Sequence, residues 1–121
     1  PYTTLFRFSN TNRPDFFLSI QQNGLSHGSA SGTEIYHYRD DSCGEEISKL
    51  IINEITKELG TKNRGVRIGD YFLLREVKST SIILQLLYIT NAKDEKLLGD
   101  EDFRIQTALA IYHAISKYYE K

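Results

Sequence analysis

The clearest pattern along the chain is a stripe of apolar residues at helical spacing between residues 42 and 59. The stripe consists of Ile47, Leu50, Ile51, Ile55 and Leu59. Ser42 and Glu45 have the spacing of a capping box, and Gly60 follows as a C-terminal cap. The pattern predicts a helix over residues 42–59. The face expected to be solvated carries Glu45, Glu46, Lys49, Glu54, Lys57 and Glu58.

Short apolar or β-forming runs predict four strands, at residues 15–20, 32–38, 71–75 and 81–87. The last of these is apolar on both faces, as expected of a central strand in a helix-covered sheet. Residues 21–31 are small and polar, which predicts a long loop.

Two more helices are expected near the C-terminus. Asn91 can cap a short helix that contains Asp94 and ends at Gly99, and Asp100 or Asp102 then starts a final helix. The apolar stripe expected for the final helix is Phe103, Ala108, Leu109, Ile111, Tyr112, Ile115 and Tyr119. Strands that alternate with helices predict an α/β fold with a mixed, mostly parallel sheet flanked by helices.

Composition narrows the classes of function. A chain of 121 residues fits a single domain, expected to span residues 1–121. The net charge of −1 gives no general attraction to nucleic acid, and no apolar run is long enough to span a membrane. The single cysteine, Cys43, cannot form an internal disulfide, and we interpret it as a small residue near a helix start.

Three segments, in order, resemble the zinc-dependent N-acetylmuramoyl-L-alanine amidases of the Amidase_3 family. Residues 19–36 (SIQQN, then SASGTEIY) resemble the family's SIHAN and SASGVETYY. Residues 62–75 (KNRGVRIGDYFLLR) are similar to KNRGVKxAxFYVLR. Residues 81–98 (SIILQLLYITNAKDEKLL) are similar to AVLVELGFLSNPEDEKLL. The chain thus resembles the C-terminal two-thirds of the family domain, without its first strand and helix, and residues 1–8 would be a remnant of the second strand.

This resemblance implies hydrolysis of the bond between N-acetylmuramic acid and L-alanine of the peptidoglycan stem peptide. In the family, two histidines and a glutamate hold zinc, and a second glutamate acts as general base. Here Gln21 stands at the position of a zinc-binding histidine and Gln85 at that of the catalytic glutamate. Leu87 replaces a family glycine, and nothing matches the other two zinc ligands. We therefore expect no zinc in this chain and a catalytically degenerate domain.

The resemblance also implies residues that could bind substrate. Asn23, Glu34, Arg64 and Arg75 match family positions, and either arginine could bind a stem-peptide carboxylate. For each arginine an ion pair that holds a helix or strand end is an equal alternative. His27 and His37 flank Glu34 but are expected in a loop and a strand, and His113 on the last helix.

A sheet without the family's first strand would expose an edge and a helix face, so the chain should form a homodimer or bind a protein that completes the sheet. The expected role is binding of a peptidoglycan stem peptide or muropeptide in the bacterial cell envelope, extracellular or spore-associated. Two alternatives stay open: an active zinc-dependent amidase whose upstream ligands lie outside this sequence, and a purely structural interaction module.

Overall fold

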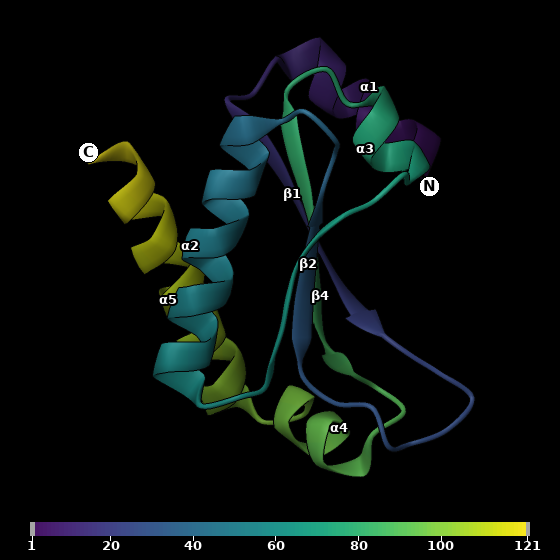
Figure 1. The fold of residues 1–121 in the computed structure, drawn as a ribbon, viewed down its shortest axis with the longest axis vertical. Helices are drawn as coiled ribbons and strands as arrows, with labels where there is room; N and C mark the ends of the chain where they lie inside the picture. Colours follow the sequence, from purple (N-terminus) through teal and green to yellow (C-terminus); the bar gives the residue numbers. More distant parts are fainter. Residues whose placement is uncertain (1, 121) are drawn as a thin grey trace.

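The computed structural model describes residues 2–120 and has a central mixed sheet between unequal helical layers (Figure 1). The strands are β1 (Phe16–Asn23), β2 (Thr33–His37), β3 (Asn63–Ile68) and β4 (Thr80–Tyr88). The helices are α1 (Tyr2–Asn12), α2 (Ser42–Leu59), α3 (Phe72–Glu76), α4 (Ala92–Leu98) and α5 (Glu101–Tyr119). The strand order is β1-β4-β2-β3, and only the β2–β4 pairing is antiparallel. The mixed, mostly parallel sheet is therefore confirmed.

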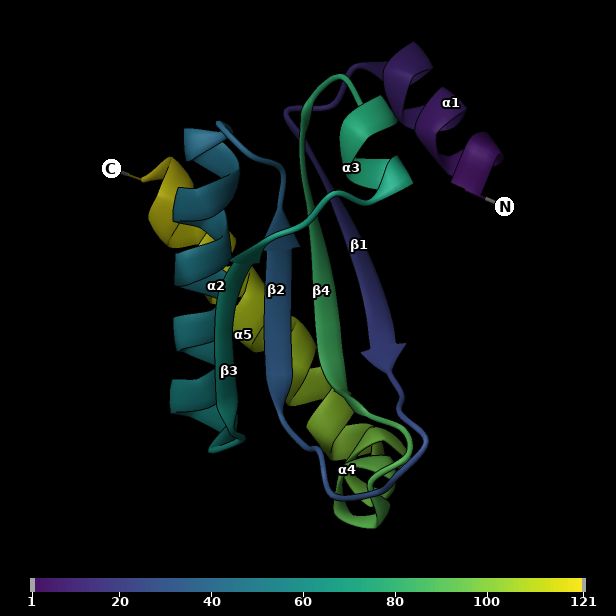
Figure 2. The ribbon, with the colours of Figure 1, turned by 45° about the vertical axis from the view of Figure 1, so that its right-hand side comes forward.

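The two faces of the sheet are covered differently. Helices α2 and α5 lie along one face, where Ile35, Ile82 and Leu84 join the larger core (Figure 2). Helices α1 and α3 cover one end of the other face, where Leu73, Leu74 and Ile83 form a smaller core. The remaining part of that face lies at the C-terminal end of β1 and β4 and has no helix over it (Figure 2).

Helix α2 has the predicted bounds, but its cap and its solvated face differ from the prediction. Asp41 is the N-cap, and its carboxylate accepts from Gly44 N at 2.9 Å. Gly60 ends the helix in a left-handed conformation with φ of 71°, as expected. Glu54, expected in solvent, is buried because α5 packs against that side of α2 and brings Lys117 to its carboxylate.

Two sequence-based assignments are wrong, and one strand was not predicted. Residues 2–12 form helix α1 rather than a strand remnant, and residues 72–76 form helix α3 rather than a strand. The apolar run at 71–75 was too short to distinguish the two states, and Leu73 and Val77 are buried one helical turn apart. Residues 63–68, read only as part of a motif, form strand β3.

One strand boundary and the buried side of one helix also differ from the prediction. Strand β1 extends to Asn23, into the predicted loop. In α5 the buried positions are Phe103, Thr107, Ala110, Ile111 and Ala114. Leu109 and Tyr112, expected in the apolar stripe, are exposed. The prediction assumed one apolar stripe, whereas α5 has apolar residues on two sides and only one of them faces α2 and the sheet.

Strand β1 is an edge strand, since within residues 2–120 it pairs with β4 alone. Beside it lies an apolar groove of about 440 Å³, bounded by the sheet and α5. Its apolar lining is Ile20, Leu86, Ile89, Leu98, Ala108 and Ile111. The expected open edge and uncovered helix face are therefore present. No helix within residues 2–120 combines the length and apolar character that a membrane span requires.

Candidate functional site

The two glutamines singled out in the sequence are neighbours on the helix-free part of the sheet. Gln21 of β1 and Gln85 of β4 are register partners in the parallel pairing. Gln85 Nε2 donates to Gln21 Oε1 at 3.1 Å, and Gln21 Nε2 donates to Ser19 Oγ at 3.2 Å. The two amides thus satisfy part of each other's hydrogen-bonding capacity within the site.

Glu34 of β2 lies on the other side of Gln85, as its register partner in the antiparallel pairing. The carboxylate is buried and accepts from Asn23 Nδ2 at 2.7 Å. Tyr88 Oη donates to the same oxygen at 3.5 Å. Glu34 therefore links β1, β2 and β4 through side chains as well as through the sheet.

Two arginines of β3 balance the charge of Glu34. Arg67 Nε lies 3.2 Å from Glu34 Oε2, and Arg64 Nε lies 3.9 Å from the same oxygen. The Arg64 guanidinium also lies over the Tyr88 ring, 5.1 Å from its centroid, and donates to Ser31 O at 3.4 Å. A buried carboxylate needs such charged partners, so this network holds the site together.

The same network affects a tyrosine on β2. Burial raises the pKa of Tyr36 well above its ordinary value, and the neighbouring Glu34 and Tyr71 raise it further. A phenolate next to a carboxylate is unfavourable, so Tyr36 keeps its proton well into the alkaline range.

Five of the predicted site residues come together and one does not. Gln21, Gln85, Asn23 and Glu34 lie side by side, and Arg64 reaches them from β3. Arg75 is on α3, where it binds the Asp70 carboxylate at 3.1 Å and the Asp70 carbonyl at 3.2 Å. Its predicted role in substrate binding would require a separate subsite.

The three histidines are apart from this site. His27 is exposed in the loop and bonded to Ser29, and His113 contacts Glu58. His37 is buried, with Nδ1 bonded to Tyr38 O. Within residues 2–120 the only three-residue group of His, Cys, Asp or Glu able to hold a metal is Glu54, Glu58 and His113. That group contains none of the residues that we call the glutamine site, namely Gln21, Asn23, Glu34, Arg64 and Gln85.

Sequence reasoning missed two residues that shape the site. Arg67 was overlooked because strand β3 was not predicted. Asp94, noted only in a helix start, is buried, and its Oδ2 accepts from Gly32 N and Tyr88 N at 3.0 Å each. Its carboxylate thereby joins the start of β2 to the end of β4. Asp94 follows Asn91 at the spacing of a helix cap, so the sequence pattern indicated only a helix start and not this second role.

Leu87 has the backbone expected of the glycine it replaces. Its φ is 62°, in the left-handed region that disfavours side chains with a Cβ, and its side chain is fully buried. The chain therefore has a left-handed residue close in sequence to Gln85, and the leucine side chain at that position packs in the larger core.

Comparison with known proteins shows the family of the chain. The Amidase_3 model, described as N-acetylmuramoyl-L-alanine amidase, matches residues 2–117. The chain belongs to this amidase family. An uncharacterized cell wall amidase of Bacillus anthracis is 36% identical over 93% of the chain.

Solved amidases have the same fold. The catalytic domain of the amidase CwlV from Bacillus (Paenibacillus) polymyxa is 27% identical, with a TM-score of 0.90 over 99% of this chain. The amidase CwlD of Clostridioides difficile, solved in complex with the GerS lipoprotein, is 28% identical with a TM-score of 0.91 over 98% of this chain. This chain spans 66% of the CwlV domain, 61% of CwlD and 23% of the Bacillus anthracis amidase.

The amidase family is zinc-dependent, but the residues at this site do not fit a zinc ion. Zinc sites in proteins use imidazole, thiolate or carboxylate ligands. Gln21 offers an amide whose oxygen already accepts from Gln85, and Gln85 offers no carboxylate. Glu34 is a carboxylate beside them, and it is engaged by two arginines and Asn23.

Proposed function

We propose that this chain is a catalytically degenerate amidase domain that binds peptidoglycan, through a stem peptide or muropeptide, in the bacterial cell envelope or spore. The observation that supports this most directly is the hydrogen bond between Gln85 and Gln21. It joins the two positions at which the family resemblance expects a general base and a zinc ligand.

The chemistry of these side chains argues against hydrolysis. A neutral amide cannot take a proton from water, so Gln85 cannot act as a general base. An amide oxygen is also a poor replacement for an imidazole on zinc. Both functions are thus lost at adjacent positions.

Binding, in contrast, needs only donors, acceptors and an accessible surface. The site offers the two amides, the Asn23 side chain and the edge of the Arg64 guanidinium on a part of the sheet without a covering helix. Arg67 is half-exposed and adds a second guanidinium, which suits the carboxylates of a stem peptide. The loop at 24–31 borders this surface.

The test is a titration of the 15N-labelled chain with a muropeptide that carries an intact stem peptide, followed by NMR. We expect shifts at Gln21, Asn23, Gln85 and the loop, and weaker binding by Arg67→Gln than by the control Arg39→Gln on an exposed turn. Absence of shifts at millimolar muropeptide would contradict binding and favour a structural module. Zinc-dependent release of stem peptide by this chain would contradict degeneracy and favour the active-amidase alternative.

The same proposal includes homodimerisation through the open edge of β1. The eight residues of β1 contain no charged residue and no proline, the devices that usually protect an edge strand. Leu109 and Ile105 of α5 and Ile89 next to the groove are also about half exposed. Two copies paired antiparallel along β1 would satisfy the edge and cover these side chains.

Light scattering across a concentration series tests this arrangement. We expect a dimer that Ile20→Lys shifts to monomer, whereas Lys93→Glu, on the exposed side of α4, leaves it unchanged. A monomer at all concentrations would contradict the homodimer, and would leave a different protein as the occupant of the edge.

A further inference from the structure

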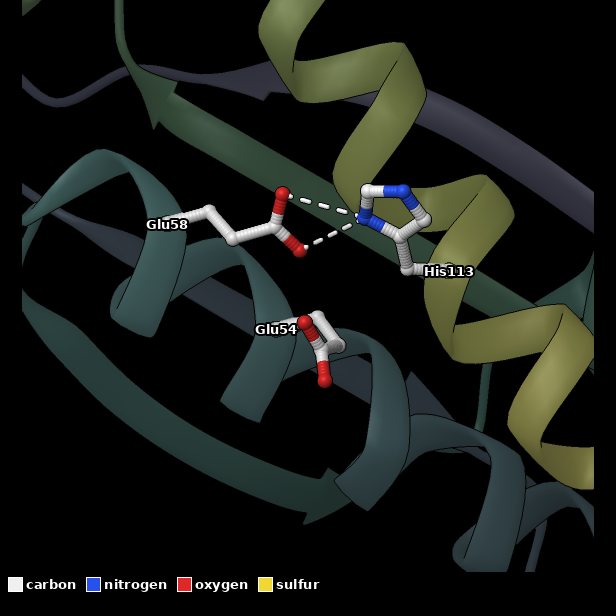
Figure 3. A group of neighbouring side chains, drawn as sticks. All are labelled: Glu54, Glu58 and His113. Atoms are coloured by element: carbon white, nitrogen blue, oxygen red, sulfur yellow. Dashed lines mark hydrogen bonds and ion pairs between the residues drawn. The ribbon is translucent and has the colours of Figure 1, made fainter.

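A second cluster of ligand-type side chains lies on the far side of the molecule from the glutamine site. Glu54 and Glu58 are one turn apart on α2, and His113 faces them from α5 (Figure 3). Their ligand atoms all lie within 4.8 Å of one another. Helices α2 and α5 cover the opposite face of the sheet from Gln21 and Gln85, so this cluster is separate from the family site.

The geometry of the cluster is fixed by helix packing. Residues four positions apart share one face of a helix, so both carboxylates point toward α5. His113 Nδ1 lies 3.1 and 3.0 Å from the two oxygens of Glu58 (Figure 3). An ionised carboxylate only accepts hydrogen bonds, so Nδ1 carries the proton and donates to both.

Glu54 is the buried member. Its carboxylate forms an ion pair with the ammonium group of Lys117. A carboxylate paired with an ammonium group is ionised, which is the state that a metal ligand requires. Lys117 itself is half-exposed and can turn its ammonium group into solvent.

We propose that Glu54, Glu58 and His113 bind a zinc ion in the hollow between α2 and α5. Two carboxylate oxygens and one imidazole nitrogen make a three-ligand zinc set, and a water would take the fourth position. The hollow also carries Glu120, Lys57 and Lys117, so three carboxylates face two ammonium groups. The ion would replace the Lys117 charge on Glu54 and the Nδ1 proton on His113. The proposal does not depend on peptidoglycan binding.

The experiment is a zinc titration of the chelator-treated chain, followed by calorimetry and by the NMR signals of the histidine rings. We expect one zinc ion per chain, with ring signals of His113 shifted and those of His27 unchanged. His113→Gln and Glu58→Gln should each weaken binding at least tenfold. The exposed His27→Gln is the matched control and should leave the affinity unchanged.

Lys117→Met is the decisive variant, because its effect on zinc affinity shows whether Lys117 competes with the ion for Glu54. Removal of the competing ammonium should strengthen zinc binding several-fold. Weaker binding by Lys117→Met would overturn the proposal, as would no binding by the wild-type chain at millimolar zinc. Equal effects of His113→Gln and His27→Gln would also overturn it. Circular dichroism of each variant confirms that the fold is intact, and the ring signals localise the ion independently of stability.

Discussion

The side-chain amide of Gln85 donates to that of Gln21 at 3.1 Å, across the parallel pairing of β1 and β4. Gln85 lies between this contact and Glu34, its partner on β2. The neutral charge of Gln85 therefore matters, because any carboxylate at position 85 would face Glu34 across the sheet.

Gln85→Glu tests this relationship. The substitution removes the donor to Gln21 and places two carboxylates opposite each other, which should lower the free energy of unfolding by about 1 kcal/mol. Urea denaturation at low salt and at 1 M salt measures it, and the loss should shrink as salt screens the repulsion. The control is Gln22→Glu, because Gln22 follows Gln21 in β1 and is exposed. Equal stability of Gln85→Glu and wild type at low salt would contradict the prediction.

Tyr36 should give the chain a characteristic alkaline instability. Because burial and Glu34 raise its pKa in the folded state, the folded chain holds this proton longer than the unfolded chain does. The stabilising contribution is present below pH about 10, the ordinary tyrosine value, and is lost as pH rises above it. We expect Tyr36→Phe to make the fall in the free energy of unfolding above pH about 10 shallower in urea denaturation.

The matched control for this measurement is Tyr112→Phe, since Tyr112 is well exposed on α5. Tyr118 contributes to the same fall, because a hydrogen bond with Cys43 and burial raise its pKa to about 12. The comparison is therefore between variants at each pH, and identical slopes for Tyr36→Phe and Tyr112→Phe would contradict the prediction.

The energetic cost of the positive φ at position 87 can be measured by comparing the stabilities of an alanine and a glycine variant. In a left-handed conformation glycine avoids the Cβ conflict, so Leu87→Gly should be more stable than Leu87→Ala by about 1 kcal/mol. At Leu86, in the extended β4, the order should reverse by about 0.5–1 kcal/mol. Urea denaturation of the four variants checks this, and the same order at both positions would refute it.

Removal of the Asp94 carboxylate should be costly. Asp94→Ala leaves the buried amides of Gly32 and Tyr88 without their acceptor, and we expect a loss of about 2–4 kcal/mol. Asp94→Asn keeps an acceptor oxygen and should lose less, while Glu95→Ala on the exposed side of α4 should be near neutral. Amide hydrogen exchange at Gly32 and Tyr88 should quicken in Asp94→Ala first. Unchanged exchange there would contradict this role.

The sequence predicted the elements whose signal is local and long. Helix α2 was placed at its observed bounds because a stripe over five turns leaves little ambiguity, and β4 was found within one residue at each end. Helix α3 was missed because five residues carry too little periodicity, and its state depends on packing Leu73 and Val77 against the sheet.

Part of the site could also be predicted, because some of its residues lie in local sequence motifs. The resemblance located Gln21, Gln85, Asn23 and Glu34, because these match ordered motifs. It could not show that Arg67 reaches Glu34, since that contact depends on the register of β3 against β2. Nor could it show Glu54 meeting His113, because α2 and α5 are far apart in sequence and meet only through the packing of two helices.

The order of the strands has a consequence for synthesis on the ribosome. Strand β1 emerges early, but its one partner within residues 2–120 is β4. Gln85, the hydrogen-bond partner of Gln21, is therefore synthesised 64 residues after it. At ordinary translation rates that interval lasts roughly 3 to 13 seconds. During it, an uncharged segment of eight residues is unpaired on the nascent chain. The strand that forms an edge within residues 2–120 is thus also exposed to wrong pairing while the chain is being made.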